Sequence, residues 1–516
     1  MTSSDDSTAI AGPDAGLSAD LVAANEHRAA ARWQEAADLY RRVLTHRPDS
    51  IEALSGLGDS LRDLGSVEEA IGLLEAGARR HQDSAALHYS LGRAYQRAGR
   101  LREAIDIYKV VLRLDRHHAD ALNSVGLFFS TRGDLENGNV MFRRALAARP
   151  KFPDALVNLG LNLKILRQYA PALSAFQKAV RFDPDDARAH WAEAQLQLLM
   201  GRFEAGWRGY EWRWRTRDVG SNRGRLFPQP SWDGKPFQGG KLLIWSEQGV
   251  GDEIMFASLL PELSGQQDCL LECDPRLVPL FARSLPGVEL VGRADPLPAR
   301  LAAPDIGAQC AAGSLARWLR PDRASFAGHG GAYLRPDLAK RDRLRARYGD
   351  DRFTVGIAWH TVKNEPTGQR RMALEEMLPI LRVSGIRFVS LQYGDHRNAI
   401  AKLAAETGIE LLQDLEIDQI KCLDDFAAQM AALDLVISID SSAAHMAGAL
   451  GVPAWVLLPH PPEWRWLLEG QGCLWWPSLR LFRQKVWRRW DGVVDEVARA
   501  LVAHVASNRG RQALAR

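Results

Sequence analysis

The richest chemical motif in this sequence is a group of polar residues where an apolar run meets a pattern of small residues. Residues 434–440 (DLVISID) predict a buried strand, and the letters SSAAHMAGALG after it predict a helix. Asp440 ends the strand and is followed by Ser441 and Ser442. His445 lies one turn inside the helix. Hydroxyls and free backbone N–H groups at a helix N-terminus favour an anion, so the motif predicts a diphosphate site.

Two residues of this motif have structural alternatives. His445 either faces the phosphates or is a structural histidine whose ring is satisfied inside the helix. Asp440 either binds a sugar or ribose hydroxyl or caps the helix. The sequence leaves both choices open.

A second motif is the turn SEQGVGDE, which follows a predicted strand at 241–245. Gly249 and Gly251 allow the backbone to approach a ligand closely. Asp252 stands at the start of the next helix, where it is either an N-cap or a general base that deprotonates an acceptor hydroxyl. The turn is therefore a candidate acceptor loop.

Cations and tryptophans follow two further predicted strands. Lys363, Arg370 and Arg371 come after the strand at 353–359, where they either bind phosphate or belong to a solvated loop. Trp464 follows the strand at 454–458 closely, so it is expected to stack on a base or sugar or to pack between lobes.

The elements before these motifs are helical hairpins. One pattern of small and bulky residues returns every 34 positions over residues 1–184, which predicts an α-solenoid of helix–turn–helix units. The bulky ring of each unit is expected to fill the gap to the next hairpin. A sixth unit is rich in tryptophan and is expected to pack the solenoid onto the next domain. The small and bulky positions are Gly58, Gly92, Gly126 and Gly160, and Tyr40, Leu74, Tyr108, Phe142 and Phe176.

Composition shifts suggest the domain boundaries. Residues 1–18 are expected to form a disordered tail, and the repeats to occupy 19–217. Short apolar runs then alternate with helical patterns, which predicts a parallel α/β architecture. We expect one lobe at 225–340, a second at 350–490, and a terminal helix at 491–506 that crosses back to the first lobe.

Composition also limits the function classes. The net charge of +3, without basic runs, argues against nucleic-acid binding. No apolar run reaches membrane-spanning length, and the N-terminus lacks the pattern of a secretory signal. Five scattered cysteines complete no zinc motif, and no Asp-x-Asp pair follows a predicted strand, so we expect no metal site and a cytoplasmic protein.

These motifs resemble known families. The 34-residue pattern resembles the tetratricopeptide repeat. The segment DLVISIDSSAAHMAGALGVPAWVLLP resembles the nucleotide-binding segment of heptosyltransferase-type glycosyltransferases (family 9), and SEQGVGDEIMFASLLP is similar to their Gly-Asp segment. SLQYGD at 390–395 resembles a segment of bacterial relatives that carry tetratricopeptide repeats. The order of repeats and lobes also resembles the protein O-GlcNAc transferases, although their motifs fit less closely.

The resemblance to family 9 spans about residues 240–505 and implies a GT-B fold of two facing Rossmann-like lobes. It also implies inverting sugar transfer from a nucleotide sugar, which is a substrate and not a cofactor. The absence of an Asp-x-Asp cluster at a predicted strand end favours a metal-independent reaction. Asp252 then corresponds to the proposed general base. Lys363 is the nearest match to the basic residue that assists the leaving diphosphate. The residues that hold the donor phosphates correspond to Asp440, Ser441 and His445.

The chain departs from the family at two places. Ser442 stands where the family commonly has glycine or alanine, so a phosphate role for its hydroxyl is not inherited. The loop after Trp359 also differs, which leaves the choice among Lys363, Arg370 and Arg371 open.

The sequence therefore predicts a glycosyltransferase whose repeats select a protein or glycan acceptor. One alternative is a scaffold whose transferase half is inactive, and another is a nucleotide-sugar sensor that acts through protein–protein interaction. The retained Asp252 and the turn from Asp440 to His445 argue against the scaffold.

Overall fold

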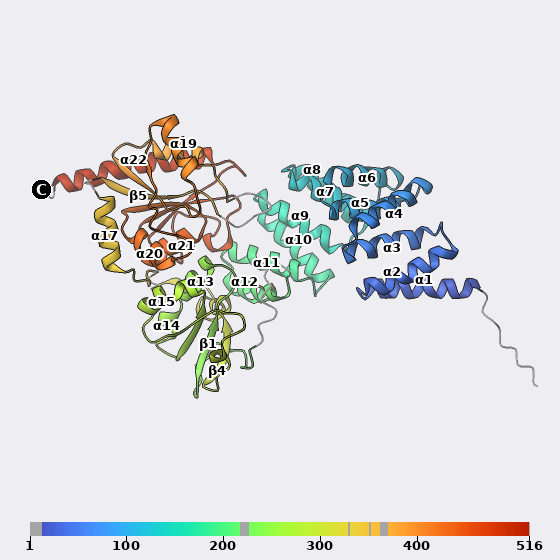
Figure 1. Ribbon diagram of the computed structural model, residues 1–516, viewed down its shortest axis with the longest axis horizontal. Coiled ribbons are helices and arrows are strands. Elements are labelled where there is room, and N and C mark those ends of the chain that lie inside the picture. Colours follow the sequence, from blue (N-terminus) through green and yellow to red (C-terminus); the bar gives the residue numbers. More distant parts are fainter. Residues whose placement is uncertain (1–12, 217–226, 329–330, 350–351, 362–369, 515–516) are drawn as a thin grey trace, which may run out of the picture. The chain divides into compact units, whose positions relative to one another are not determined.

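The computed structural model describes residues 13–216, 227–328, 331–349, 352–361 and 370–514 of the chain. The chain divides into two compact units (Figure 1). The first comprises Met1–Leu166 and Lys178–Pro184, and the second comprises Arg167–Gln177 and Asp185–Arg516. Each unit is described by itself.

Paired helices make up the repeat half. From the second pair onward, the first helices begin 34 residues apart, and the second helices keep the same spacing, which confirms the predicted repeats. Residues 13–18 were expected in a disordered tail but belong to the first helix, because helix formation begins at Pro13. The helices are α1 (Pro13–Ala29), α2 (Trp33–His46), α3 (Ile51–Leu64), α4 (Val67–Arg80), α5 (Ala85–Arg97), α6 (Leu101–Leu114), α7 (Ala119–Thr131), α8 (Leu135–Ala148), α9 (Pro153–Ile165), α10 (Tyr169–Phe182), α11 (Ala187–Leu199) and α12 (Phe203–Tyr210).

The regular spacing of small and bulky residues sets how closely the helices of one pair approach. A Cβ placed on Gly92 would lie 2.5 Å from Tyr108 Cε1, and one on Gly126 would lie 2.6 Å from Phe142 Cε1. Each ring therefore lies over the glycine of its own hairpin, and not only in the gap to the next hairpin as expected.

The sixth pair, α11 and α12, belongs to the α/β unit and not to the solenoid unit. The 3-10 helix η1 (Glu211–Arg215) follows α12 directly. Trp207 and Tyr210 of α12 are buried, and the indole N–H of Trp207 donates to the carbonyl of Arg320 at 2.7 Å. The last repeat is thus part of the core of the second unit.

The α/β unit contains two sheets whose described strands are all parallel, as the alternating pattern predicts. The first sheet has the order β3-β2-β1-β4, and the second has the order β10-β9-β8-β5-β6-β7. The strands of the first sheet are β1 (Lys241–Trp245), β2 (Cys269–Cys273), β3 (Glu289–Gly292) and β4 (Ile306–Ala311). Those of the second are β5 (Phe353–Ala358), β6 (Ile386–Ser390), β7 (Leu411–Leu412), β8 (Leu435–Ile439), β9 (Ala454–Leu458) and β10 (Leu479–Arg483).

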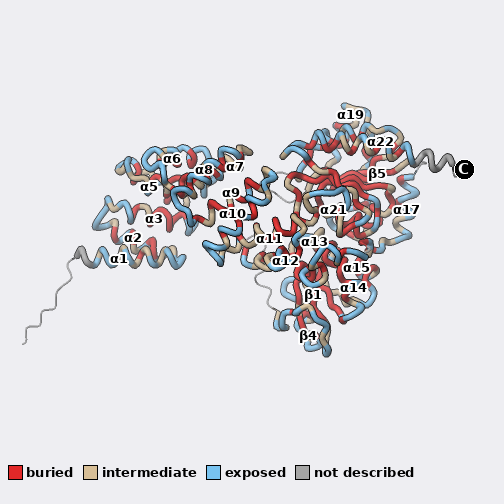
Figure 2. The backbone as a smooth tube through the Cα atoms, turned by 180° about the vertical axis from the view of Figure 1, so that it is seen from behind, coloured by how far each residue is buried: buried red, intermediate tan, exposed pale blue. Residues whose placement is uncertain are grey.

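Helices cover both sheets, and the strands β2, β5, β8 and β9 are among the most deeply buried segments of the unit, whereas the edge strand β3 is only half-buried (Figure 2). Continuous apolar strands are typical of parallel sheets that are buried on both faces. The main helices are α13 (Val250–Ala257), α14 (Leu260–Leu263), α15 (Val278–Ser284), α17 (Leu338–Tyr348), α18 (Leu378–Leu381), α19 (Arg397–Thr407), α20 (Leu423–Ala431), α21 (Ser442–Leu450) and α22 (Asp491–Leu514).

The terminal helix α22 packs on the second sheet and does not cross back to the first lobe as expected. Its residues Val493, Val497 and Leu501 belong to the same hydrophobic core as Val355 and Leu435 of strands β5 and β8. The apolar stripe of the helix therefore covers the sheet that precedes it in the sequence.

Candidate functional site

Two of the predicted turns meet in the α/β unit although they lie far apart in the sequence. The turn after β1 leads into α13, the turn after β8 leads into α21, and these two helices pack together. A Cβ on Gly251 would lie 3.2 Å from both Ser442 Cα and His445 Cδ2. Gly251 therefore makes room for the other helix, in addition to any ligand. Gly249 has open space, since only Asp252 Oδ2 lies within 4 Å of its Cβ position.

Helix α21 begins without a capping side chain. Its N-cap is Ser441, whose backbone is extended and whose side chain makes no capping hydrogen bond. The Ser441 hydroxyl instead lies 3.1 Å from the hydroxyl of Ser438. Asp440 is not the cap residue either, so its alternative role as a helix cap is excluded. The first turn of α21 thus keeps its backbone donors free of a capping side chain.

Asp440 is a buried carboxylate beside a cation. It is 1% exposed, and its Oδ2 lies 3.8 Å from Arg370 Nη1. Burial raises the pKa of Asp440, and the Arg370 and Arg465 cations oppose that rise. Oδ2 accepts no hydrogen bond within the described part of the chain. This oxygen can therefore accept a hydrogen bond from a hydroxyl of a bound ligand.

His445 is a neutral, buried ring. Burial, together with the Arg465 and Arg370 cations, holds the pKa of His445 well below its ordinary value. Its Nδ1 accepts a hydrogen bond from the indole N–H of Trp476 at 3.1 Å. A neutral imidazole that accepts at Nδ1 carries its proton on Nε2, so Nε2 is a hydrogen-bond donor. The ring of Trp466 stacks on the imidazole at a centroid distance of 5.2 Å.

Asp252 is the third residue of α13 and not its N-cap, which is Gly249. Its Oδ2 accepts a hydrogen bond from the backbone N–H of Gly249 at 3.4 Å. Its Oδ1 accepts from Arg465 Nη2 at 2.6 Å. The carboxylate is thus held at the point where α13 faces α21, with 18% of its side chain exposed.

Arg465 is the site residue that the sequence patterns did not reveal. It lies in the short 3-10 helix η8 (Trp464–Trp466), and its side chain is 10% exposed. Burial lowers the pKa of Arg465, but Asp252, Glu463 and Asp440 outweigh this and raise it. The flanking tryptophans form a recognisable cluster in the sequence, whereas one arginine among many carries no pattern of its own.

The three cationic residues that follow β5 differ in where the structure places them. Lys363 lies outside the described residues. Arg370 is placed beside Asp440. Arg371 is exposed, pairs with His360 through an isolated β-bridge, and accepts a hydrogen bond from Trp490 Nε1 at its carbonyl. Among the described residues, Arg370 is therefore better placed for the phosphate role than Arg371.

Trp464 lies in an aromatic cluster with residues of the sixth repeat and the first lobe. It is 4% exposed, and its ring centroid lies 5.2 Å from Trp207, 5.7 Å from Tyr210 and 6.5 Å from Phe256. These contacts surround the indole with protein. They support the packing alternative over stacking on a ligand.

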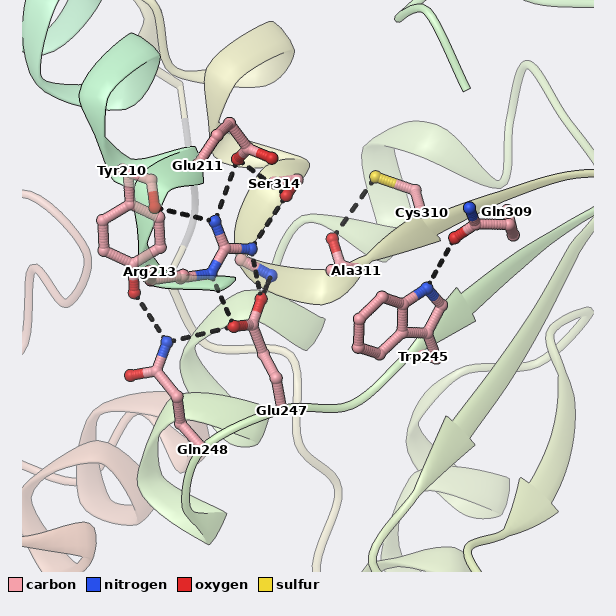
Figure 3. Close-up of polar contacts among 11 residues, drawn as sticks. Tyr210, Glu211, Arg213, Trp245, Glu247, Gln248, Gln309, Cys310, Ala311 and Ser314 are labelled. Atoms are coloured by element: carbon pink, nitrogen blue, oxygen red, sulfur yellow. Dashed lines mark hydrogen bonds and ion pairs between the residues drawn. The ribbon is translucent and has the colours of Figure 1, made fainter. Parts of the chain in front are cut away.

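A buried ion pair between Arg213 of η1 and Glu247 holds the turn after β1 in place (Figure 3). Arg213 and Glu247 are both fully buried, and two parallel hydrogen bonds of 2.7 Å join them. Glu247 also accepts from the backbone N–H of Gly313 at 2.9 Å. Gln248, the next residue, donates to the hydroxyl of Tyr210 at 2.8 Å. The sixth repeat therefore holds the acceptor-loop turn in place.

The SLQYGD segment fixes the end of β5. The side-chain oxygen of Gln392 accepts from the backbone N–H groups of Trp359 and His360, at 2.9 and 3.0 Å. Its amide donates to the carbonyl of His360 at 3.0 Å. His360 also lies 3.2 Å from His396 between their Nε2 atoms. These contacts order the carboxyl end of a strand beside the β8 turn.

Several cavities lie elsewhere in the described part of the unit. One of about 860 Å³ is lined by residues at the amino end of β6, including Ile386, and by α19. Another, of about 430 Å³, lies at the carboxyl ends of β9 and β10 and includes Arg483 and Gln484. In parallel α/β sheets, ligands bind outside the carboxyl ends of the strands. The first cavity lies at the amino end of β6 and is therefore not expected to be the substrate site.

Comparison with known proteins identifies relatives for both halves. Two family profiles described as tetratricopeptide repeat match residues 21–85, 55–121 and 89–138, and residues 153–186. The chain is 30% identical over 491 residues to Protein FlbA of Caulobacter vibrioides, and the match covers 92% of this chain and 76% of that protein.

Solved structures match only part of the chain. MamA is 25% identical and the match covers 32% of this chain and 96% of MamA, with a TM-score of 0.27. A thermophilic TPR protein of Thermus thermophilus is 22% identical, with coverages of 35% and 99% and a TM-score of 0.33. In the described ranges, no helix is long and apolar enough to cross a membrane.

Proposed function

This chain belongs to the family of Protein FlbA, and we propose that it is an inverting glycosyltransferase with a GT-B arrangement of its two sheets. The observation that carries the proposal is the meeting of the two predicted turns. Asp252 follows Gly251, which packs against the first turn of α21, where a donor diphosphate would bind, and its carboxylate bonds to Arg465. The absence of a side chain at Gly251 sets the distance between α13 and α21, so the positions of the two turns depend on each other.

The donor half of the proposed site is built on α21. Its uncapped N-terminus offers backbone N–H groups to the diphosphate, and Arg370 adds a cation at the end of β5. The neutral ring of His445 donates from Nε2, and Asp440 accepts from a sugar or ribose hydroxyl. These groups stabilise the negative charge that builds up on the leaving nucleoside diphosphate.

The acceptor half is built on α13. Asp252 takes the proton from the acceptor hydroxyl as its oxygen attacks the anomeric carbon of the donor sugar. The bond from that carbon to the diphosphate oxygen breaks, and its electron pair leaves with the nucleoside diphosphate. Attack from the side opposite the leaving group inverts the anomeric carbon. We propose that the repeats bind the protein or glycan that carries the acceptor hydroxyl.

Thermal-shift measurements with ADP-, GDP-, UDP- and CMP-sugars test the donor site. A glycosyltransferase is stabilised by at least one of them and transfers its sugar, and Asp252→Asn abolishes most of the transfer while the donor still binds. Asp342→Asn, an exposed change on α17, serves as the control and leaves transfer intact. Absence of stabilisation by every donor would overturn the proposal.

A nucleotide-sugar sensor is the second candidate, because the ion pair between Asp252 and Arg465 occupies the base in this structure. A sensor binds a donor without turning it over. If the wild-type protein binds a donor but does not turn it over, that result would favour the sensor.

A further inference from the structure

Arg465 lies between the starts of two helices that face each other. Its guanidinium bonds to Asp252 at the start of α13, while the neighbouring Trp466 stacks on His445 in the first turn of α21. The Arg465 guanidinium also lies over the ring of Trp464 at 5.0 Å. The aromatic cluster around Trp464 therefore fixes the backbone of η8 and the direction of this side chain.

Two buried donors beside α21 lack acceptors. Arg465 Nε and Trp466 Nε1 have no hydrogen-bond partner within the residues that the structure describes. The Trp466 indole lies close enough to Asp440 to lower the pKa of that carboxyl, but the two do not meet in hydrogen-bond geometry. The Arg465 side chain is 10% exposed and Trp466 is 1% exposed. A buried polar group without a partner is unfavourable, and Trp466 has the Asp440 carboxylate close by, so the Arg465 Nε group is the donor that indicates a ligand with an acceptor.

The charges around Arg465 come from several elements. Asp252 faces it from α13, Asp440 from the end of β8, and Glu463 from the residue before η8. The Arg370 cation and the neutral His445 lie on the same side as Asp440. Among the described residues, Asp252 is the carboxylate that hydrogen-bonds to Arg465, next to the position where the proposed diphosphate binds.

We propose that Arg465 couples donor binding to release of the general base: it pairs with Asp252 before the donor binds and transfers to the donor diphosphate afterwards. This inference rests on the proposed function. A diphosphate carries more negative charge than one carboxylate, and its oxygens match the planar fork of a guanidinium. Once Arg465 has moved to the diphosphate, the Asp252 oxygen that bonded to it is free to accept the proton of the acceptor hydroxyl.

Calorimetric titration of the full chain with ADP, GDP and UDP tests this exchange. Arg465→Met is expected to weaken binding of the preferred nucleoside diphosphate roughly 10- to 100-fold, because a hydrogen-bonded charge is lost. Binding of the corresponding nucleoside, which lacks phosphate, stays the same. Arg465→Lys retains the charge but not the fork, and weakens binding less.

The proposed exchange of partners also predicts a variant that binds the nucleoside diphosphate more tightly. Asp252→Asn removes the competitor for the guanidinium, so the nucleoside diphosphate binds about fivefold or more tightly. This gain is absent from the double variant Asp252→Asn with Arg465→Met. Arg345→Met is the matched control, since it breaks an Arg345–Asp434 ion pair of 2.7 Å at the amino end of β8.

The outcomes separate the two proposals. If no nucleoside diphosphate binds the wild-type chain, the proposed function fails. If the wild-type chain binds one and Arg465→Met binds it equally well, only the role of Arg465 is overturned. Unchanged or weaker binding by Asp252→Asn would overturn the exchange even if Arg465→Met did not fold.

Discussion

At the residue scale, the candidate site depends on contacts that leave little room for change. Gly251 allows α13 to approach α21, and Asp252 beside it pairs with Arg465. Single residues therefore determine both the separation of the two helices and the charge where they meet. Two changes at this scale have definite expected results.

Gly251→Val is expected to destabilise the α/β unit by about 1–3 kcal/mol and to weaken donor binding. Its Cβ would lie 3.2 Å from the Ser442 Cα atom, which is backbone and cannot rotate away. Thermal unfolding and nucleotide titration measure the two effects. Gly249→Ala is the control because its Cβ meets only Asp252 Oδ2, at 3.8 Å. Equal effects of the two variants would contradict the close approach.

His445 gives a pH-dependent stability. Its pKa in the folded chain is well below 6.5, chiefly because of burial. As the pH falls through about 6.5, the unfolded chain takes up a proton at this residue and the folded chain does not. The folded state therefore loses stability with falling pH, by about 1.4 kcal/mol per pH unit below that value.

His445→Asn removes this contribution and keeps an acceptor for the Trp476 indole N–H. The thermal midpoint of the variant should fall less between pH 7 and pH 5 than that of the wild type. His117→Asn, at an exposed repeat position, should leave the wild-type slope in place. An unchanged slope in His445→Asn would show that the ring is not kept neutral.

At the element scale, the hairpins α5–α6 and α7–α8 are each defined by the fit of one aromatic ring over one glycine. This fit explains why the same residue types return at a fixed spacing: the helices can approach closely only where a side chain is missing. Helical glycine is otherwise unfavourable, so glycines without such a contact have no packing role. The solenoid contains both kinds.

Gly126→Ala and Gly72→Ala should therefore have opposite effects on the solenoid. At Gly126 the new Cβ would lie 2.6 Å from the buried ring of Phe142, and we expect a loss of about 1–3 kcal/mol. At Gly72 the Cβ meets nothing within 4 Å, and we expect a gain of up to about 1 kcal/mol. Chemical denaturation followed by helical circular dichroism measures both. The same sign for both variants would contradict the packing explanation.

At the scale of the whole molecule, the repeat period and the structural units have different boundaries. The period continues through α11 and α12, but these helices belong to the α/β unit. The reason is the buried pair of Arg213 with Glu247 and the contact of Trp207 with Trp464. The last hairpin therefore contributes to the core that supports the candidate site.

A fragment that begins at Arg167 is expected to fold and to unfold near the temperature of the α/β unit in the full chain. A fragment that begins at Phe227 lacks Arg213 and leaves Glu247 without its cation, which costs roughly 3–5 kcal/mol. Thermal scanning and limited proteolysis compare the two. Glu247→Met in the shorter fragment should recover part of the loss, and equal stability of the unmodified fragments would contradict the shared core.

The sequence by itself determined the repeated hairpins, the parallel strands and the turns that carry Asp252 and Asp440. These features follow from local periodicity and from residue types at strand ends, which act over short distances along the chain. It also offered the right alternatives for Trp464, without deciding between them. The edge strand β10 and the extent of α22 escaped the pattern, because short apolar segments are ambiguous in isolation.

Only the tertiary structure decided how these pieces combine. It brought Gly251 against Ser442, placed Arg465 on Asp252, and assigned the sixth hairpin to the α/β unit. Each of these depends on contacts between residues distant in the sequence, and a single arginine or glycine has no local signal that identifies its partner. The local rules thus define the groups that can do chemistry, and the packing of the two sheets defines which of them can act together.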